Sequence, residues 1–246
     1  RDWSSDVCSS DLPALLGVLV LFLLPESPTW LASRGRSAGA KPPAPLRELF
    51  RPPLLRVTLV GIMLGSIPLV GAWAASKWMI PWADEIGRAV RSDYKAVTQG
   101  WWATGAIIGS LVGAQIAALL GRRISYFLIS IGSFSLTWAM FQLTAPLQAS
   151  FLPIVFAQGL IATLFFGWLP LYLPELFPTA VRATGSGISY NVGRFATAVG
   201  VLAAGALFTT LGGSYARVGA AASFIYGLGI LVIWFAPETN RQSLVK

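Results

Sequence analysis

Long apolar stretches alternate with short polar connections along almost the whole chain. Each full stretch has about twenty residues, which as a helix matches the roughly 30 Å hydrocarbon thickness of a bilayer. Backbone groups in lipid must pair within their own segment, so these stretches are predicted to be helices. The six full-length ones lie at residues 57–81, 97–120, 124–143, 151–173, 185–211 and 219–235. The pattern predicts an all-α polytopic membrane protein.

The composition agrees with this and removes several kinds of chemistry. Of the 246 residues, 55% are hydrophobic and 11% are charged, whereas a soluble domain carries about 25% charged residues. The sequence has no histidine, which excludes Ser-His-Asp and Cys-His catalysis and His-ligated zinc or haem sites. Its single cysteine is Cys8, so no internal disulfide is available. We therefore expect no catalytic residue, no metal and no cofactor.

Basic residues gather in every second connection. Residues 33–56 hold six Arg and Lys, residues 83–96 mix three acidic with three basic residues, and Arg122 and Arg123 follow in the next turn. Short basic loops stay on the cytoplasmic side of a membrane. We therefore expect the segment 25–56, the GRR turn, the PELFPT loop and the C-terminus in the cytoplasm. The net charge of +8 then reflects topology, and no nucleic-acid partner is expected.

The N-terminal part of the chain differs from the rest. Residues 1–12 (RDWSSDVCSSDL) are polar and resemble a translated sequencing adapter, so we expect them to be an artefact. The apolar run at residues 13–24 rises only about 18 Å as a helix, too little to cross a bilayer. We therefore expect the chain to be a fragment. Residues 25–56, rich in Pro and Arg, are predicted to be a linker with an amphipathic stretch at residues 46–55.

Four sequence motifs stand at the ends of the apolar runs. They are PESPTWL at residues 25–31, GAQIAALLGRR at 113–123, LPELFPTAVRATGSGISYNVGR at 173–194 and PET at 237–239. In this order, they resemble the C-terminal half of a major facilitator superfamily (MFS) transporter, of the branch with sugar porters and metabolite:proton symporters. The resemblance implies a six-helix C-terminal bundle at residues 57–236 (helices 7–12), preceded by the end of helix 6 at 13–24 and followed by a cytoplasmic tail at 237–246. It also implies a separate N-terminal bundle as partner.

The chain departs from the family pattern at two places. The family usually carries an acidic and a basic residue three and two positions before the GRR glycine, where this chain has Ala118 and Leu119. After PET it has Asn240 and Arg241, where Lys-Gly is common in the family. Both differences concern gating rather than the fold.

Charged residues near the GRR and PELFPT motifs are candidates for a gate. The resemblance implies that they form ion pairs in the outward-facing state and separate when the transporter opens inward. Exposed ion pairs contribute only about 0–1 kcal/mol each, which suits a latch that must open. For Arg122 and Arg123, plain anchoring at the cytoplasmic surface is the alternative. The candidates for this latch are Arg122, Arg123, Glu175, Arg182 and Arg194.

Glycines recur at a spacing of four residues in two of the predicted helices. Small residues on one stripe let helix backbones approach closely, in a static interface or in a sliding one. The glycines are Gly61, Gly65, Gly105, Gly109 and Gly113. Pro68 lies within the first span and must break one backbone hydrogen bond, and broken helices commonly line a transporter's substrate cavity.

Polar and aromatic residues within the apolar runs are candidates for binding a solute. Trp73, Lys77 and Trp78 could offer aromatic faces and an ammonium group, and a lysine inside a span costs about 2.5–3.5 kcal/mol unless it faces a cavity or a partner. The alternative is that Lys77 snorkels to the outer surface while the tryptophans form an interfacial belt. Gln158 and Asn191 could complete a polar cavity or simply bond neighbouring helices.

These observations favour a secondary transporter that moves a small organic solute, a sugar or an organic acid, by alternating access and with proton coupling. The expected location is a bacterial inner membrane, with the lipid bilayer, the solute and protons as partners. Export of hydrophobic compounds is the alternative within the same fold. A membrane-embedded enzyme or a solute sensor is the alternative outside transport. Trp101 and Trp102 begin a span and are predicted to be interfacial.

Overall fold

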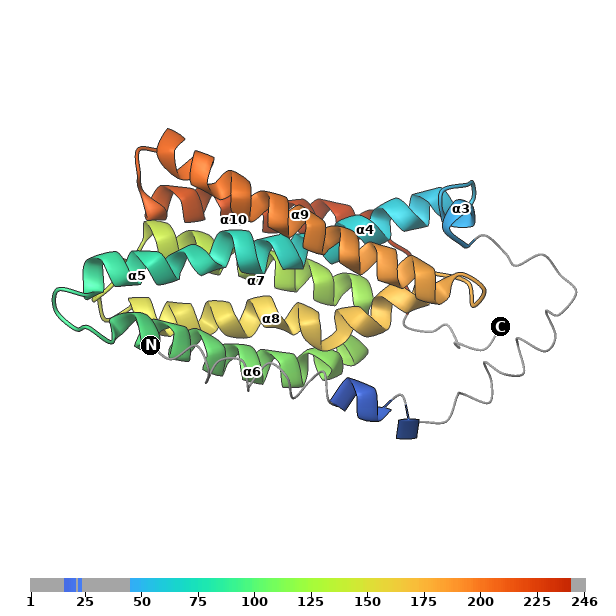
Figure 1. Ribbon diagram of the computed structural model, residues 1–246, viewed down its shortest axis with the longest axis horizontal. Coiled ribbons are helices and arrows are strands. Elements are labelled where there is room, and N and C mark those ends of the chain that lie inside the picture. Colours follow the sequence, from blue (N-terminus) through green and yellow to red (C-terminus); the bar gives the residue numbers. More distant parts are fainter. Residues whose placement is uncertain (1–15, 21, 24–44, 240–246) are drawn as a thin grey trace, which may run out of the picture. The chain divides into compact units, whose positions relative to one another are not determined.

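The computed structural model describes residues 16–20, 22–23 and 45–239, and Figure 1 shows it as a ribbon. Residues 16–20 and 22–23 are helical and belong to a unit separate from the rest. The adapter-like segment, most of the expected linker and the end of the tail lie outside the described residues. The assignments of residues 1–12, 13–24, 25–56 and 237–246 as distinct regions therefore stay predictions.

From Pro45 onward the chain is a bundle of long helices that run along a common direction (Figure 1). Six of its helical segments are long and apolar enough to cross a membrane, and the described residues contain no strand. This confirms an all-α polytopic membrane protein. The elements are α3 (Pro45–Leu49), α4 (Leu54–Val70), η1 (Gly71–Ala75), η2 (Ser76–Trp78), α5 (Met79–Gly87), α6 (Tyr94–Leu120), α7 (Arg122–Gln142), α8 (Phe151–Glu175), α9 (Arg182–Thr210), α10 (Tyr215–Val232) and η3 (Ile233–Phe235).

The first span, residues 54–87, is interrupted near its middle. Pro68 lies inside α4 and has no N–H, so the carbonyl of Leu64 lacks its helical partner. Tyr126 of α7 donates its hydroxyl to this carbonyl at 3.0 Å. A π-helical turn, η1, and a 3-10 turn, η2, follow before α5 begins. The interruption predicted from Pro68 is therefore present, one turn beyond the proline.

Glycine stripes bring two pairs of helices into close contact. A Cβ on Gly105 would lie under 3.0 Å from the carbonyl oxygen of Phe156, and one on Gly109 would lie equally close to that of Leu160. Gly113 of α6 faces α8 in the same way, while Gly61 and Gly65 of α4 face Ser189 of α9. The glycine stripes thus lie at packed interfaces, and sliding at these interfaces stays a prediction.

Turns at the helix ends use backbone geometry that favours glycine. Gly121, with φ of 87°, is the single residue between α6 and α7. Gly212 and Gly213, with φ of 72° and 70°, turn the chain from α9 to α10. Ser214 then caps α10, because its hydroxyl accepts a hydrogen bond from the backbone N–H of Arg217.

The six spans differ in how much of their apolar surface is covered within the chain. Half of the most apolar window of α8 is buried, compared with 22% for α6 and 6% for α9. Large apolar side chains such as Leu111 of α6 and Leu202 of α9 are exposed. In a membrane such side chains contact lipid or another protein surface. The expected N-terminal bundle, as one such surface, stays a prediction.

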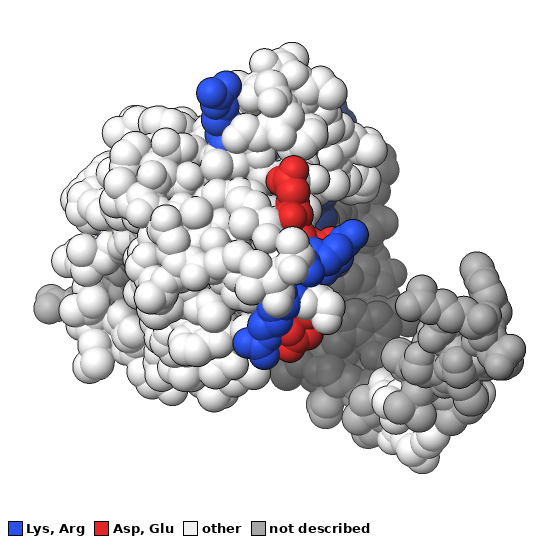
Figure 2. All heavy atoms as spheres, turned by 90° about the vertical axis from the view of Figure 1, so that its left-hand side faces the viewer, with Lys and Arg blue, Asp and Glu red and all other residues white. Residues whose placement is uncertain are grey.

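Figure 2 shows the end of the bundle that lies at the left of Figure 1. Most of this face is uncharged, and most of its acidic and basic side chains lie next to each other in one strip. Arg88 pairs here with Asp84, and Arg91 pairs with Asp93 at 2.6 Å. Residues 83–96, which include the loop between α5 and α6, thus carry equal numbers of acidic and basic residues, and the side of the membrane on which they lie stays a prediction.

Candidate functional site

A cavity of about 550 Å³ lies between the first span, α6, α8 and α9. Its wall includes Leu69, at the end of α4, and Ala72, within the π-helical turn η1. Aromatic side chains cover much of the rest, and two basic side chains reach it. These aromatic and basic residues are Trp73, Lys77, Trp102, Phe166, Tyr190 and Arg194.

Lys77 is held within this cavity by groups on α6. Its ammonium donates a hydrogen bond to Oε1 of Gln99 at 3.2 Å and lies 3.5 Å from the centroid of the Trp102 ring. The Trp73 ring is 5.8 Å away. A cation over an indole face is stabilised by the ring quadrupole. Lys77 thus lines the cavity, and the choice between solute binding and snorkelling stays a prediction.

Arg194 brings a second cation to the same cavity from α9. Its guanidinium lies 5.2 Å from the ring of Tyr190, four residues earlier on the helix. The part of the cavity wall that the structure describes contains no Asp or Glu. The two positive charges are therefore not neutralised by an acidic side chain of this wall.

A chain of hydrogen bonds lies directly behind the cavity wall. The indole N–H of Trp102 donates to Oε1 of Gln158 at 2.8 Å. The Gln158 amide in turn donates to the hydroxyls of Ser76 and, at 3.3 Å, Thr137. Ser76 also contacts the Tyr226 hydroxyl at 3.3 Å. Gln158 is fully buried and is not part of the cavity lining.

Two of the predicted solute-binding residues lie elsewhere. Trp78 stacks on Phe208, with ring centroids 6.2 Å apart, and contacts Tyr215. The physical reason is that neighbouring residues in a 3-10 turn such as η2 point about 120° apart, so Trp78 turns away from the face of Lys77. Asn191 is exposed and donates to the carbonyl of Gly187 at 2.8 Å.

Trp102 corrects a further expectation, because we predicted it to be interfacial. The helix α6 begins at Tyr94, so Trp102 lies about 12 Å along it at 1.5 Å per residue. There its ring forms cavity wall, whereas Trp101 points outward and is 43% exposed. Tyr190, which lines the cavity, and Gln99, which binds Lys77, were not predicted, and no sequence pattern marks either.

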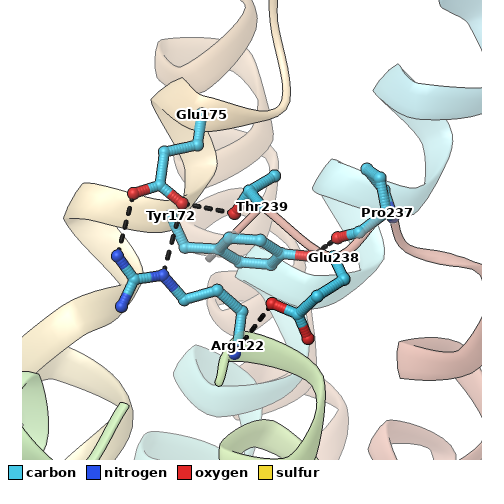
Figure 3. Close-up of polar contacts among 6 residues, drawn as sticks. All are labelled: Arg122, Tyr172, Glu175, Pro237, Glu238 and Thr239. Carbon is cyan, nitrogen blue, oxygen red and sulfur yellow. Dashed lines mark hydrogen bonds and ion pairs between the residues drawn. The ribbon is translucent and has the colours of Figure 1, made fainter. Parts of the chain in front are cut away.

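Three of the four sequence motifs contribute to a second site, the motif cluster, part of which is drawn in Figure 3. The motif cluster consists of Arg122, Arg123, Tyr172, Glu175 and residues 237–239, while PESPTWL lies outside the described residues. Nη2 of Arg122 lies 2.9 Å from Oε1 of Glu175, and Nε lies 3.3 Å from Oε2. The two side chains are only 14% and 13% exposed. Thr239 donates its hydroxyl to the same carboxylate. This pair joins the start of α7 to the end of α8.

The PET motif, residues 237–239, completes this motif cluster. Both oxygens of Glu238 accept backbone N–H bonds, at 3.1 Å each, from Arg122 and Arg123. Because these N–H groups begin α7, the carboxylate caps the positive end of that helix. Tyr172 donates its hydroxyl to the carbonyl of Pro237 at 2.7 Å (Figure 3). Glu238 and Tyr172 were not among the predicted residues, although the PET motif pointed to this segment.

The predicted latch residues thus divide into separate groups. Arg122 and Glu175 form the ion pair, and Arg123 donates to the carbonyl of Ala236 at 2.6 Å. Arg182 donates to the carbonyl of Phe177 at 3.3 Å. Arg194 is twelve residues further along α9, about 18 Å away at 1.5 Å per residue, and it lines the cavity.

Comparison with known proteins gives a consistent set of similarities. A family described as "Sugar (and other) transporter" matches residues 43–246. A probable 4-methylmuconolactone transporter of Cupriavidus pinatubonensis is 29% identical over 241 residues, covering 97% of this chain and 54% of the relative. A cis,cis-muconate transport protein of Acinetobacter baylyi is 27% identical over 225 residues, covering 88% and 53%.

A third relative is more similar over a shorter region. The inner membrane metabolite transport protein YhjE of Escherichia coli is 36% identical over 155 residues, which is 58% of this chain and 34% of the relative. The chain spans about half the length of the two muconate-related relatives.

Proposed function

The chain belongs to the sugar (and other) transporter family, as its resemblance to MFS transporters led us to expect, and we propose that it transports a small organic anion. The observation that carries this proposal is the pair of cations, Lys77 and Arg194, in one cavity whose described wall has no acidic residue. A carboxylate placed between them would receive charge-assisted hydrogen bonds.

The aromatic lining of the cavity favours a solute with a flat apolar part. Trp73, Trp102, Phe166 and Tyr190 offer flat apolar faces, which suit a ring or a conjugated chain better than a sugar with hydroxyls on all sides. The named substrates of two relatives, cis,cis-muconate and 4-methylmuconolactone, are unsaturated organic acids. These properties together favour an organic acid over a sugar and over a hydrophobic compound.

We propose that transport follows alternating access and is coupled to protons, in a bacterial inner membrane with the C-terminus in the cytoplasm. Importing one negative charge against 100 mV, inside negative, costs about 2.3 kcal/mol. A proton carried along with a monoanion cancels this electrical cost. Binding, reorientation and release require no covalent chemistry, so the proposal does not include an enzymatic step.

We further propose that the motif cluster works as a latch. Arg122 and Glu175 hold the ends of α7 and α8 together in the arrangement that the structure shows. Separation of the pair accompanies the change to the other state. The cap that Glu238 places on α7 does not depend on the Arg122 side chain.

The proposal is tested with the complete gene product in proteoliposomes. Uptake of labelled cis,cis-muconate is measured at an inward proton gradient, with glucose as a neutral comparison. Hydrogen bonds to charged groups contribute about 1.5–3 kcal/mol, so Lys77→Ala or Arg194→Ala should raise the KM about 10-fold to 100-fold. The matched control is Arg217→Ala, an exposed arginine in the first turn of α10 that lies outside the cavity lining.

Each outcome bears on one part of the proposal. Saturable muconate uptake that depends on Lys77 and Arg194 but not on Arg217 supports the anion site. Glucose uptake, or muconate uptake that neither substitution alters, contradicts it. Uptake that is insensitive to dissipation of the proton gradient removes the coupling from the proposal.

A further inference from the structure

Gln158 is a polar residue of α8 whose burial is not explained by the solute cavity. The sequence left open whether it completes a polar cavity or bonds neighbouring helices, and its side chain is fully buried and lies outside the cavity lining. Burying an amide is costly unless its donors and its acceptor are satisfied. The side chain bonds to residues of three other elements, Trp102 on α6, Ser76 on η2 and Thr137 on α7.

The orientation of the Gln158 amide is fixed by its partners. An indole N–H can only donate, so the Gln158 atom that faces Trp102 must be the carbonyl oxygen. The amide nitrogen therefore points toward Ser76 and Thr137. Ser76 donates its own proton to the carbonyl of Gly71 at 3.2 Å, which leaves the Ser76 oxygen free to accept from Gln158.

The Trp102 ring connects the hydrogen bonds of Gln158 to the cavity. The Trp102 indole is bound to Gln158 on one edge and supports the Lys77 ammonium, 3.5 Å from its centroid, on one face. The rotation of the Trp102 ring therefore sets where Lys77 can lie. The cation–π contact depends on the ammonium remaining over the ring face.

We infer that Gln158 is a positioning residue that holds the Trp102 ring in place, and through it the Lys77 ammonium, for an anionic solute. This inference rests on the proposed transport function and adds a residue that acts on affinity without touching the solute. The contacts of Gln158 include the first span through Ser76, so loss of its side chain also removes a hydrogen bond between that span and α8.

The test replaces Gln158 with residues of similar size that cannot hold the ring. Gln158→Met keeps the length of the side chain but loses the amide oxygen, and Gln158→Asn keeps an amide that is one methylene too short. Gln158→Glu keeps an oxygen acceptor at the same distance. The matched control is Gln115→Met, because Gln115 is an exposed glutamine on α6, thirteen residues from Trp102.

Two measurements are made on each variant of the complete protein. The first is the ¹⁹F spectrum of protein labelled with 5-fluorotryptophan, in which Trp102→Phe assigns the Trp102 resonance. The second is the KM and maximal rate of cis,cis-muconate uptake. Loss of one buried hydrogen bond should raise the KM about five-fold to ten-fold, with an unchanged maximal rate.

The expected result is a shifted Trp102 resonance and a raised KM in Gln158→Met and Gln158→Asn, with both unchanged in Gln115→Met. Gln158→Glu keeps the acceptor for Trp102 but adds a buried negative charge that opposes an anion, so only its Trp102 resonance should return. An unmoved Trp102 resonance in the Met and Asn variants overturns the inference. So does a KM that rises equally in the Gln115 control. If the Met variant fails to insert, the Asn variant decides the question.

The fluorine spectrum requires no transport, so it separates this inference from the proposed function. Absence of muconate uptake by the unaltered protein contradicts the anion proposal, while the Trp102 resonance still shows whether Gln158 orients the ring.

Discussion

The Arg122–Glu175 ion pair gives a prediction whose size comes from its geometry. Two nitrogens of the guanidinium meet two oxygens of the carboxylate, at 2.9 and 3.3 Å. Unit charges about 4 Å apart attract by about 4 kcal/mol at an effective dielectric constant of about 20, before the costs of desolvation and ordering. Hydrogen bonds to charged groups retain about 1.5–3 kcal/mol after those costs. We expect a coupling energy of about 2 kcal/mol.

The measurement is a double-mutant cycle on the free energy of unfolding. The variants are Arg122→Gln, Glu175→Gln and both together, unfolded with SDS in mixed micelles. Glutamine at position 175 keeps an oxygen that can accept from Thr239, so the cycle isolates the charge interaction. The backbone bond from Arg122 to Glu238 is unaffected by the substitutions.

A matched control comes from the other end of the bundle. Arg88 and Asp84 pair four residues apart, with side chains that are 70% and 22% exposed. Such pairs contribute about 0.3–0.5 kcal/mol. The reasoning is refuted if the Arg122–Glu175 cycle gives a coupling no larger than that of Arg88 and Asp84. A clearly larger coupling shows that burial at the motif cluster strengthens this pair.

Two further predictions concern packing. Gly109→Ala places a Cβ under 3.0 Å from the backbone carbonyl of Leu160, so α6 and α8 must separate, and we expect a loss of about 1–3 kcal/mol in the free energy of unfolding. Gly100→Ala, with nothing within 4 Å of the added Cβ, should lose no stability in the same unfolding assay and gain up to about 1 kcal/mol. Tyr126→Phe leaves the Leu64 carbonyl without its hydroxyl partner, which should lower the free energy of unfolding by about 1–3 kcal/mol. An unchanged free energy of unfolding would mean that another donor replaces the Tyr126 hydroxyl.

The sequence predicts the number and kind of elements well, because hydropathy reports where a helix meets hydrocarbon. It predicts their starts less well. The helices at Leu54, Tyr94, Arg182 and Tyr215 begin three or four residues before the apolar runs. The reason is that a membrane helix continues into the interface, where polar residues such as those around Lys95 are tolerated. Trp102 was predicted to be interfacial because the start of its helix was placed too late.

Which side chains meet in space was only partly predictable. Lys77 was suspected because an ammonium within a span needs a cavity or a partner, and the motifs at Arg122 and Glu175 identified the second site. The assignment of Arg194 to the latch had no geometric basis, since a basic residue inside a span can face either end. No hydropathy pattern could show that Gln99 and Gln158 meet Lys77 and Trp102, because those contacts depend on how three helices are rotated.

The cavity wall consists of parts with different backbone hydrogen bonding. Glycine contacts bring the backbones of α6 and α8 together along much of their length, so the bond between Trp102 and Gln158 joins two helices that are already held close. Lys77 instead extends from a segment of the first span, between Gly71 and Trp78, in which α-helical hydrogen bonding gives way to a π-helical and a 3-10 turn. We propose that a solute bound to Lys77 connects this irregular segment to the closely packed pair. A solute that binds one arrangement of the segment more tightly than another would shift the conformational equilibrium toward that arrangement.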